Sequence, residues 1–163
     1  HVAQPQKVTV AIITYFPFLG GYYSEGLEIL KLCQESLQAS RQTPGAIPFD
    51  LLVFDNASCP EVRQYLIQQQ EQGRIQFLLL SDRNIGKGGA WNFIFGAAPG
   101  DYIAYADSDV YFYPGWLEAL LPLFDRFPRL GMVTGMPLRV PEEYSTSTLE
   151  WAQAQPDRHT PPG

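Results

Sequence analysis

The chain has 163 residues, of which 45% are apolar and 17% charged, and its formal net charge is −6. This length allows one ordinary domain with a substantial core, and the composition excludes a disordered chain. The acidic balance and the lack of a basic run exclude nucleic acid as an expected partner. Cys33 and Cys59 fit no zinc spacing, so we expect reduced thiols.

Neither a membrane span nor a leader is predicted. No apolar run approaches the roughly 20 residues that a transmembrane helix needs, and no signal peptide opens the sequence. We therefore expect a cytoplasmic protein, with any membrane association peripheral and made through segments outside this chain.

Predicted strands alternate with predicted helices along the chain. The run at 7–14 is almost continuously apolar and β-branched, which is typical of a strand buried on both faces. Further strands are predicted at 49–54, 75–80 and 102–106, and a short fifth strand at 131–135. Helices are predicted from a cap at Ser24 through Leu37, from Pro60 through Gln69, from Ala90 through Phe95, and from Trp116 through Phe127. This alternation predicts the α/β class, a three-layer α/β/α sandwich with a mainly parallel central sheet.

Polar residues follow these strands at their carboxyl ends, where ligands bind in parallel sheets. Thr14, Asp55 and Arg83 follow the first three strands, and Asp107 and Asp109 follow the fourth. If the backbone stays extended past Ala106, both aspartates point to one side. Their oxygens would suit Mg²⁺ or Mn²⁺, which commonly bridge to phosphates. The alternative is an ordinary turn, because Asp-Ser-Asp is good turn chemistry.

Two further features have both a functional and a structural interpretation. The Asp55 carboxylate can accept a hydrogen bond from the N–H of a flat base, or it can cap the helix that follows. The segment 81–89 carries Arg83, Lys87 and three glycines before a predicted helix. Such a segment can hold a diphosphate, because glycines let backbone N–H groups approach an anion, or it can be a flexible surface loop.

Four segments together resemble the donor half of GT-A type nucleotide-sugar glycosyltransferases, especially glycosyltransferase family 2. They are 10–15 (VAIITY), 53–58 (VFDNAS), 83–92 (RNIGKGGAWN) and 101–109 (DYIAYADSD). Each is weak alone, but their order and spacing are specific, and the likeness runs from about residue 7 to residue 135. The resemblance implies the Rossmann-like GT-A fold.

The resemblance also implies a site and a reaction. The nucleotide-sugar site would consist of Thr14, Tyr15, Asp55, Asn56, Arg83, Asn84, Gly86, Lys87, Gly88 and Asp107. Asp55 would bind the base, Asn84 and Asn92 would shape the loop over the diphosphate, and Asp109 with Asp107 would hold Mn²⁺ or Mg²⁺. The implied activity is a metal-dependent transfer, with inversion, of a sugar from a UDP- or GDP-sugar to an unknown acceptor.

The chain departs from this family in two places. The loop after Tyr15 (FPFLGG) stands where a short polar turn is more common, and only 137–163 remain for an acceptor side. We expect a donor-binding domain at 1–136, and at 137–163 the start of a truncated or disordered acceptor-side segment. No catalytic base is assigned, because Glu142 and Glu143 fit solvated loop residues better. A non-catalytic donor-binding or interaction domain is the alternative, and a nucleotidyltransferase ranks lower because residues 15–21 carry no Lys or Arg.

Overall fold

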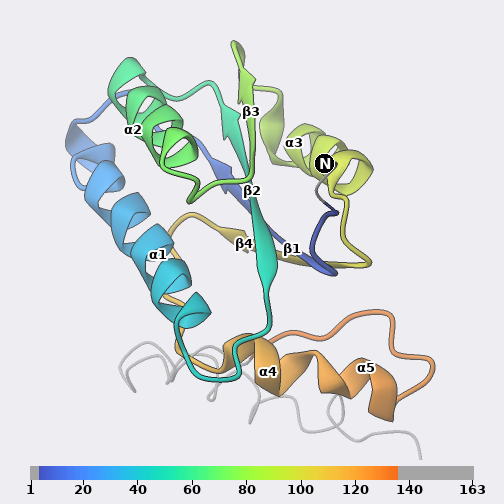
Figure 1. Ribbon diagram of the computed structural model, residues 1–163. Coiled ribbons are helices and arrows are strands. Elements are labelled where there is room, and N and C mark those ends of the chain that lie inside the picture. Colours follow the sequence, from blue (N-terminus) through green and yellow to red (C-terminus); the bar gives the residue numbers. More distant parts are fainter. Residues whose placement is uncertain (1–3, 136–163) are drawn as a thin grey trace, which may run out of the picture. The chain divides into compact units, whose positions relative to one another are not determined.

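The computed structural model describes residues 4–135, which form an α/β fold around a parallel sheet (Figure 1). Its four strands are β1 (Val8–Thr14), β2 (Phe49–Asn56), β3 (Phe77–Ser81) and β4 (Tyr102–Asp107). They are hydrogen-bonded in the order β3-β2-β1-β4, and all pairs are parallel. Every residue of β1 is buried, as its continuous apolar run predicts. The predicted fold class is therefore confirmed.

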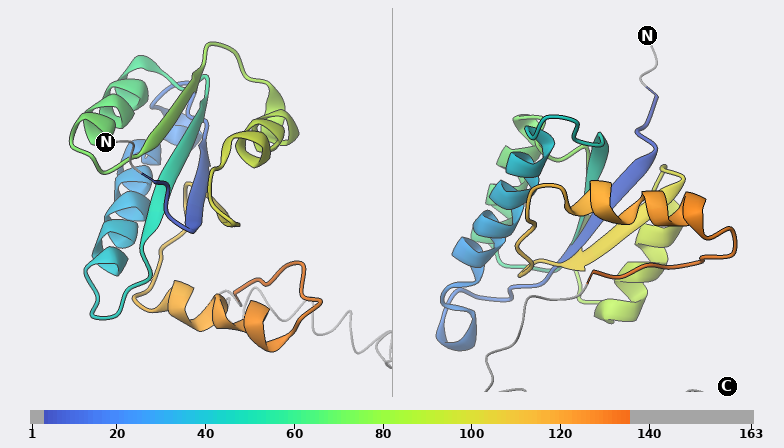
Figure 2. Two further views of the ribbon diagram at one scale, coloured as in Figure 1. Left: turned by 45° about the vertical axis from the view of Figure 1, so that its right-hand side comes forward. Right: turned by 90° about the horizontal axis from the view of Figure 1, so that it is seen from below.

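Helices cover both faces of this sheet, which makes the three layers (Figure 2). The helices α1 (Gly26–Arg41) and α2 (Pro60–Glu71) lie on one face, and α3 (Gly86–Ala97) lies on the other. One hydrophobic core joins α1 and α2 to Val10, Ile12 and Val53. A second core joins α3 to Ala11, Ile13 and Phe54. Alternate residues of the central strands thus point to different helices.

The strand order reverses at β1, and this reversal decides where a ligand can enter. From β1 the chain continues to β2 and β3 on one side, and then returns to place β4 on the other side of β1. In open parallel sheets, ligands bind beyond the carboxyl ends of the strands at such a reversal. Tyr15 follows β1 there, and Ser108 follows β4.

The helix predictions are wrong in three places: two helices begin elsewhere, and one is interrupted. Helix α1 begins at Gly26 after Glu25, and no side chain caps it, so Ser24 is not the cap. Helix α3 begins at Gly86 rather than Ala90. The predicted helix at 116–127 is divided into α4 (Trp116–Leu120) and α5 (Pro122–Arg126), because Pro122 has no N–H to continue the helical ladder.

The predicted fifth strand is also wrong. Residues 131–135 adopt no regular secondary structure. This short run has a glycine at each end, and glycine lowers the propensity for a strand. A 3-10 turn at Gly21–Tyr23 completes the elements found within residues 4–135.

The chain divides into two compact units, with the division between Pro122 and Leu123. The predicted boundary at 136/137 lies at the end of the described residues and stays a prediction. Glu142 and Glu143 lie outside the described residues. None of the helices within residues 4–135 combines the length and the apolar character needed to span a bilayer.

Candidate functional site

The strand register brings the predicted site residues to one edge of the sheet and sorts them onto its two faces. Thr14 lies beside Asp55, and both follow the alternation that faces α1 and α2. Asp107 lies beside Ile13, which belongs to the core under α3. Asn56 follows Asp55 and therefore also points toward α3. The edge thus carries one polar group on each face of the sheet.

Asp55 is the centre of the group on the α1 and α2 face, and its side chain is fully buried. Thr14 Oγ1 donates to it over 3.3 Å, and the Ser58 backbone N–H donates over 3.2 Å. Arg63 Nε pairs with the same carboxylate at 2.9 Å, and the Arg63 guanidinium also donates to the Ser81 carbonyl oxygen. The bonds from the chain itself thus compensate the buried charge. Binding of a base by Asp55 stays a prediction.

Sequence reasoning missed Arg63. It lies in the first turn of α2, eight residues after Asp55, and it joins the ends of β2 and β3. A buried carboxylate requires a compensating cation, so a buried Asp55 was a signal that an arginine or lysine lies beside it. Nothing in the sequence, however, distinguishes Arg63 from Arg74 or Arg83 as that partner. The predicted alternative for Asp55, a helix cap, is also not what the structure has, because the N-cap of α2 is Cys59.

The loops after β1 and β2 are tied together at Phe16. Its N–H donates to Ser58 Oγ over 3.0 Å, and its carbonyl accepts from the Cys59 N–H at 2.8 Å. Ala57, just before Ser58, adopts a left-handed backbone with φ 70°. Such a conformation is unfavourable for alanine by about 1 kcal/mol, so surrounding contacts maintain it. These bonds position Tyr15, which follows β1 and is 36% exposed.

On the α3 face, two asparagines shape the loop between β3 and α3. Asn56 Nδ2 donates to Asn84 Oδ1 over 2.9 Å, and Asn56 Oδ1 accepts from the Ile85 N–H over 2.9 Å. Asn84 Oδ1 also accepts from the Gly86 N–H over 2.8 Å. These contacts position the loop between β3 and α3, and the part of Asn84 in binding a nucleotide sugar stays a prediction. Asn92 lies exposed further along α3, away from these bonds.

The loop presents two cations in different ways. Lys87, in the first turn of α3, reaches both carboxylate oxygens of Asp107, at 2.7 and 2.8 Å. Gly88 follows it in the same turn, with open space where a Cβ would lie. Arg83 is exposed, and its carbonyl accepts from Ser81 Oγ over 2.6 Å. The structure therefore joins Lys87 to Asp107 and leaves Arg83 at the surface.

Asp107 and Asp109 do not share one extended segment. Strand β4 ends at Asp107, and residues 108–109 form a turn. The condition for both side chains to point to one side, an extended backbone past Ala106, is therefore not met at residues 108–109. Burial raises the pKa of Cys33 on α1 to about 12, and the nearby Asp109 carboxylate contributes to this rise while the Val110 backbone opposes it. Asp107 pairs with Lys87 on α3.

Helix α1 holds the chain that follows Asp109. The Phe112 N–H donates to the buried Ser36 Oγ over 3.0 Å, and Ser36 Oγ donates to the Cys33 carbonyl over 2.7 Å. The Phe112 ring packs on Trp116, with ring centroids 4.8 Å apart. Since Asp109 is only three residues earlier, these contacts limit the positions that its carboxylate can reach.

The two aspartates fit a divalent cation in their chemistry but do not form a complete protein cage. Within residues 4–135, no group of three or more His, Cys, Asp or Glu side chains could hold a metal ion. Mg²⁺ commonly takes one or two carboxylates and completes its shell with phosphate oxygens and water. Carboxylates of this kind could take part in such a shell, but the structure does not bring Asp107 and Asp109 together, so a cation held by both stays a prediction.

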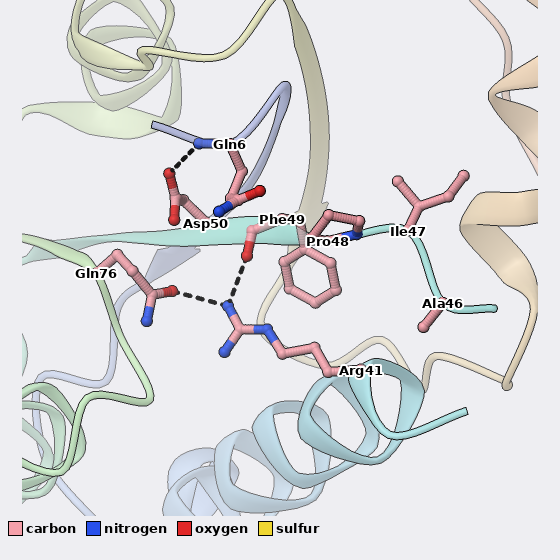
Figure 3. Close-up of a pocket in the computed structure, with 8 residues that line it drawn as sticks. All are labelled: Gln6, Arg41, Ala46, Ile47, Pro48, Phe49, Asp50 and Gln76. Carbon is pink, nitrogen blue, oxygen red and sulfur yellow. Dashed lines mark hydrogen bonds between the residues drawn. The ribbon is translucent and has the colours of Figure 1, made fainter. Parts of the chain in front are cut away.

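A separate cavity of about 340 Å³ lies at the opposite, amino end of the strands (Figure 3). Arg41 extends across it to the Phe49 carbonyl at 3.1 Å and to Gln76 Oε1 at 2.7 Å. Asp50 in the same wall accepts from the Gln6 N–H over 2.8 Å. Arg41 and Asp50 thus already bond to other residues of the chain. The cavity lies apart from the end of the sheet that carries Asp55 and Asp107.

The family described as Glycosyl transferase family 2 matches residues 22–159. The chain belongs to this glycosyltransferase family. An "Uncharacterized glycosyltransferase alr2836" of Nostoc sp. (strain PCC 7120) is 29% identical over 84 residues, which are 52% of this chain and 26% of that protein.

Solved structures of this glycosyltransferase fold include TarS of S. aureus. The crystal structure of TarS 1-349 superposes with a TM-score of 0.58 at 19% identity, over 82% of this chain and 38% of the TarS chain. The complex of TarS 1-349 with UDP-GlcNAc gives the same TM-score and covers 37% of that chain. This likeness establishes the GT-A fold. The chain spans only about a quarter to two fifths of the length of these relatives.

Proposed function

We propose that this chain carries the donor site of a glycosyltransferase that uses a nucleoside-diphosphate sugar. The observation that carries the proposal is the place of the Lys87–Asp107 pair, at the carboxyl end of β4 where the strand order reverses. A cation and a carboxylate there are suited to a diphosphate and its metal ion. Family membership and the TarS complexes with UDP-GlcNAc and UDP support UDP as the nucleotide to test first.

Each side chain then has a defined task. Lys87 and the N–H groups of the first turn of α3 neutralise the diphosphate. Tyr15 borders the base, in the loop that Phe16 and Ser58 hold in place. Asp107 and Asp109 would hold Mn²⁺ or Mg²⁺, and the bound ion would supply a Lewis acid for the negative charge of the departing nucleoside diphosphate. An acceptor hydroxyl attacks the anomeric carbon from the opposite side and inverts it, with its proton passing to a base outside the assigned residues.

Thermal unfolding with UDP and MnCl₂ tests this proposal. At a ligand concentration of 100 times Kd, binding adds about 2.7 kcal/mol, which for a chain of this length raises Tm by roughly 5–10 °C. Asp109→Ala should abolish the part of the rise that depends on Mn²⁺. Asp101→Ala, the same change at the other end of β4, is the matched control and should retain it. If neither UDP nor GDP raises Tm when Mn²⁺ is present, the proposal is wrong.

A further inference from the structure

The Lys87–Asp107 pair has a consequence for the order in which ligands bind. We propose that Lys87 is an internal stand-in for the metal ion: it occupies Asp107 in the free protein, and it moves to the phosphates when a nucleoside diphosphate arrives. The divalent cation then binds together with the nucleotide or after it, and only weakly before it. This inference rests on the proposed donor site and describes how that site is regulated.

The contact geometry supports an exchange. The Lys87 ammonium lies 2.7 Å from one oxygen of Asp107 and 2.8 Å from the other, so it covers both positions that a cation would take. The Lys87 side chain is 62% exposed and the Asp107 side chain 52% exposed. Ion pairs so open to water are weak and rearrange without disturbing the core. Lys87 therefore blocks Asp107 but can be drawn away.

The backbone under Lys87 is fixed, so the exchange needs only a side-chain movement. Gly86, just before Lys87, donates to Asn84 Oδ1 over 2.8 Å, and Asn84 is bound in turn to Asn56 at the end of β2. Gly86 has a φ of 75°, a conformation that glycine adopts readily. The first turn of α3 is thus held against the sheet, and the flexible stem of Lys87 extends from it.

Electrostatics sets the direction of the exchange. A divalent ion that approaches Asp107 in the free protein meets the Lys87 charge within a few ångströms and is repelled. A nucleoside diphosphate carries more negative charge than one carboxylate, so it competes well for the ammonium. Once Lys87 has moved, both carboxylate oxygens of Asp107 are open to the cation. We expect the charge of Lys87 to lower the affinity for the free ion by about tenfold, since a unit charge some 4 Å away acts with this order of strength in water.

Binding of Mn²⁺ alone, read from the loss of the free-ion EPR signal, tests the proposal. Lys87→Met should bind Mn²⁺ about tenfold more tightly than the wild type. Lys87→Arg keeps the charge and should match the wild type. Lys31→Met, which removes another exposed ion pair at 2.7 Å, is the matched control and should also match it. Adding Asp107→Asn to Lys87→Met should remove the gain.

Calorimetry with UDP in EDTA measures the other half of the exchange. Lys87→Met should bind UDP several-fold more weakly. The same substitution should therefore strengthen the binding of Mn²⁺ and weaken the binding of the nucleotide. The proposed role of Lys87 is wrong if wild type and Lys87→Met bind Mn²⁺ alone with equal affinity, or if neither binds it. This holds whatever the measurements with UDP give. If the wild type fails to bind UDP with Mn²⁺ present, the proposed function fails instead, and the Mn²⁺ comparison still decides on Lys87.

Discussion

Replacing Arg63 with methionine tests how the buried Asp55 is stabilised. The change keeps much of the length of the side chain but removes the cation 2.9 Å from a carboxylate with no exposed surface. Removing one partner of a buried ion pair costs about 3–5 kcal/mol, because the other charge is left uncompensated. The Arg63 side chain is 29% exposed, so water can reach part of the gap. We therefore expect the free energy of unfolding to fall by about 2–3 kcal/mol.

Urea unfolding of four proteins measures this effect: wild type, Arg63→Met, Asp55→Asn and the double variant. Asp55→Asn should cost about 1 kcal/mol, because the amide oxygen still accepts hydrogen bonds and Arg63 can turn to water. The double variant should lose less than the sum of the single variants, by about 1–2 kcal/mol. For a chain of this length, Arg63→Met should lower Tm by roughly 5–10 °C.

Additive losses, within about 0.5 kcal/mol, would refute the reasoning, since independent residues add and coupled residues do not. Lys31→Met is the control for a lost lysine or arginine charge. The Lys31–Glu28 pair is exposed on α1, so its removal should change stability by less than about 0.5 kcal/mol. A similar loss in Arg63→Met and Lys31→Met would show that the ion pair of Asp55 contributes no more than a surface pair.

Three further changes test other parts of the fold. Ala57→Gly should raise the free energy of unfolding by up to about 1 kcal/mol in urea, because glycine adopts a φ of 70° without strain; a loss would refute this. Gly26→Ala should destabilise by about 1–3 kcal/mol, because the added Cβ would lie 2.4 Å from the Phe16 ring, and an unchanged urea midpoint would contradict the packing. Burial raises the pKa of Cys33 and of Tyr65 to about 12, from 9.0 and 10.0. Above about pH 9 the unfolded chain releases these protons first, so stability should fall as pH rises toward 12. Cys33→Ala should show a shallower fall, measured as urea midpoints at pH 8 and 10.5, and an equal slope would exclude the thiol.

The sequence allowed the fold class and the edge of the sheet that carries the candidate site to be predicted. Strands β1 and β2 were found because a strand buried on both faces is apolar along its whole length. Thr14, Asp55 and Asp107 could be placed at one edge because parallel strands end together. The break before α5 was also present in the sequence, as Pro122, but the apolar spacing across it concealed it.

Only the tertiary structure decided which of these residues meet. Asp55, next to the end of β2, and Asp107, at the end of β4, lie on either side of β1. The pleat directs Asp55 toward Arg63 on α2 and Asp107 toward Lys87 on α3. Glycine is a poor helix former, so the sequence also concealed that α3 begins at Gly86, where Asn84 binds the first free N–H. Strand patterns depend on local burial and can be read along the chain. The partner of a charge depends on which helix covers which face, and that is determined when the whole sheet assembles.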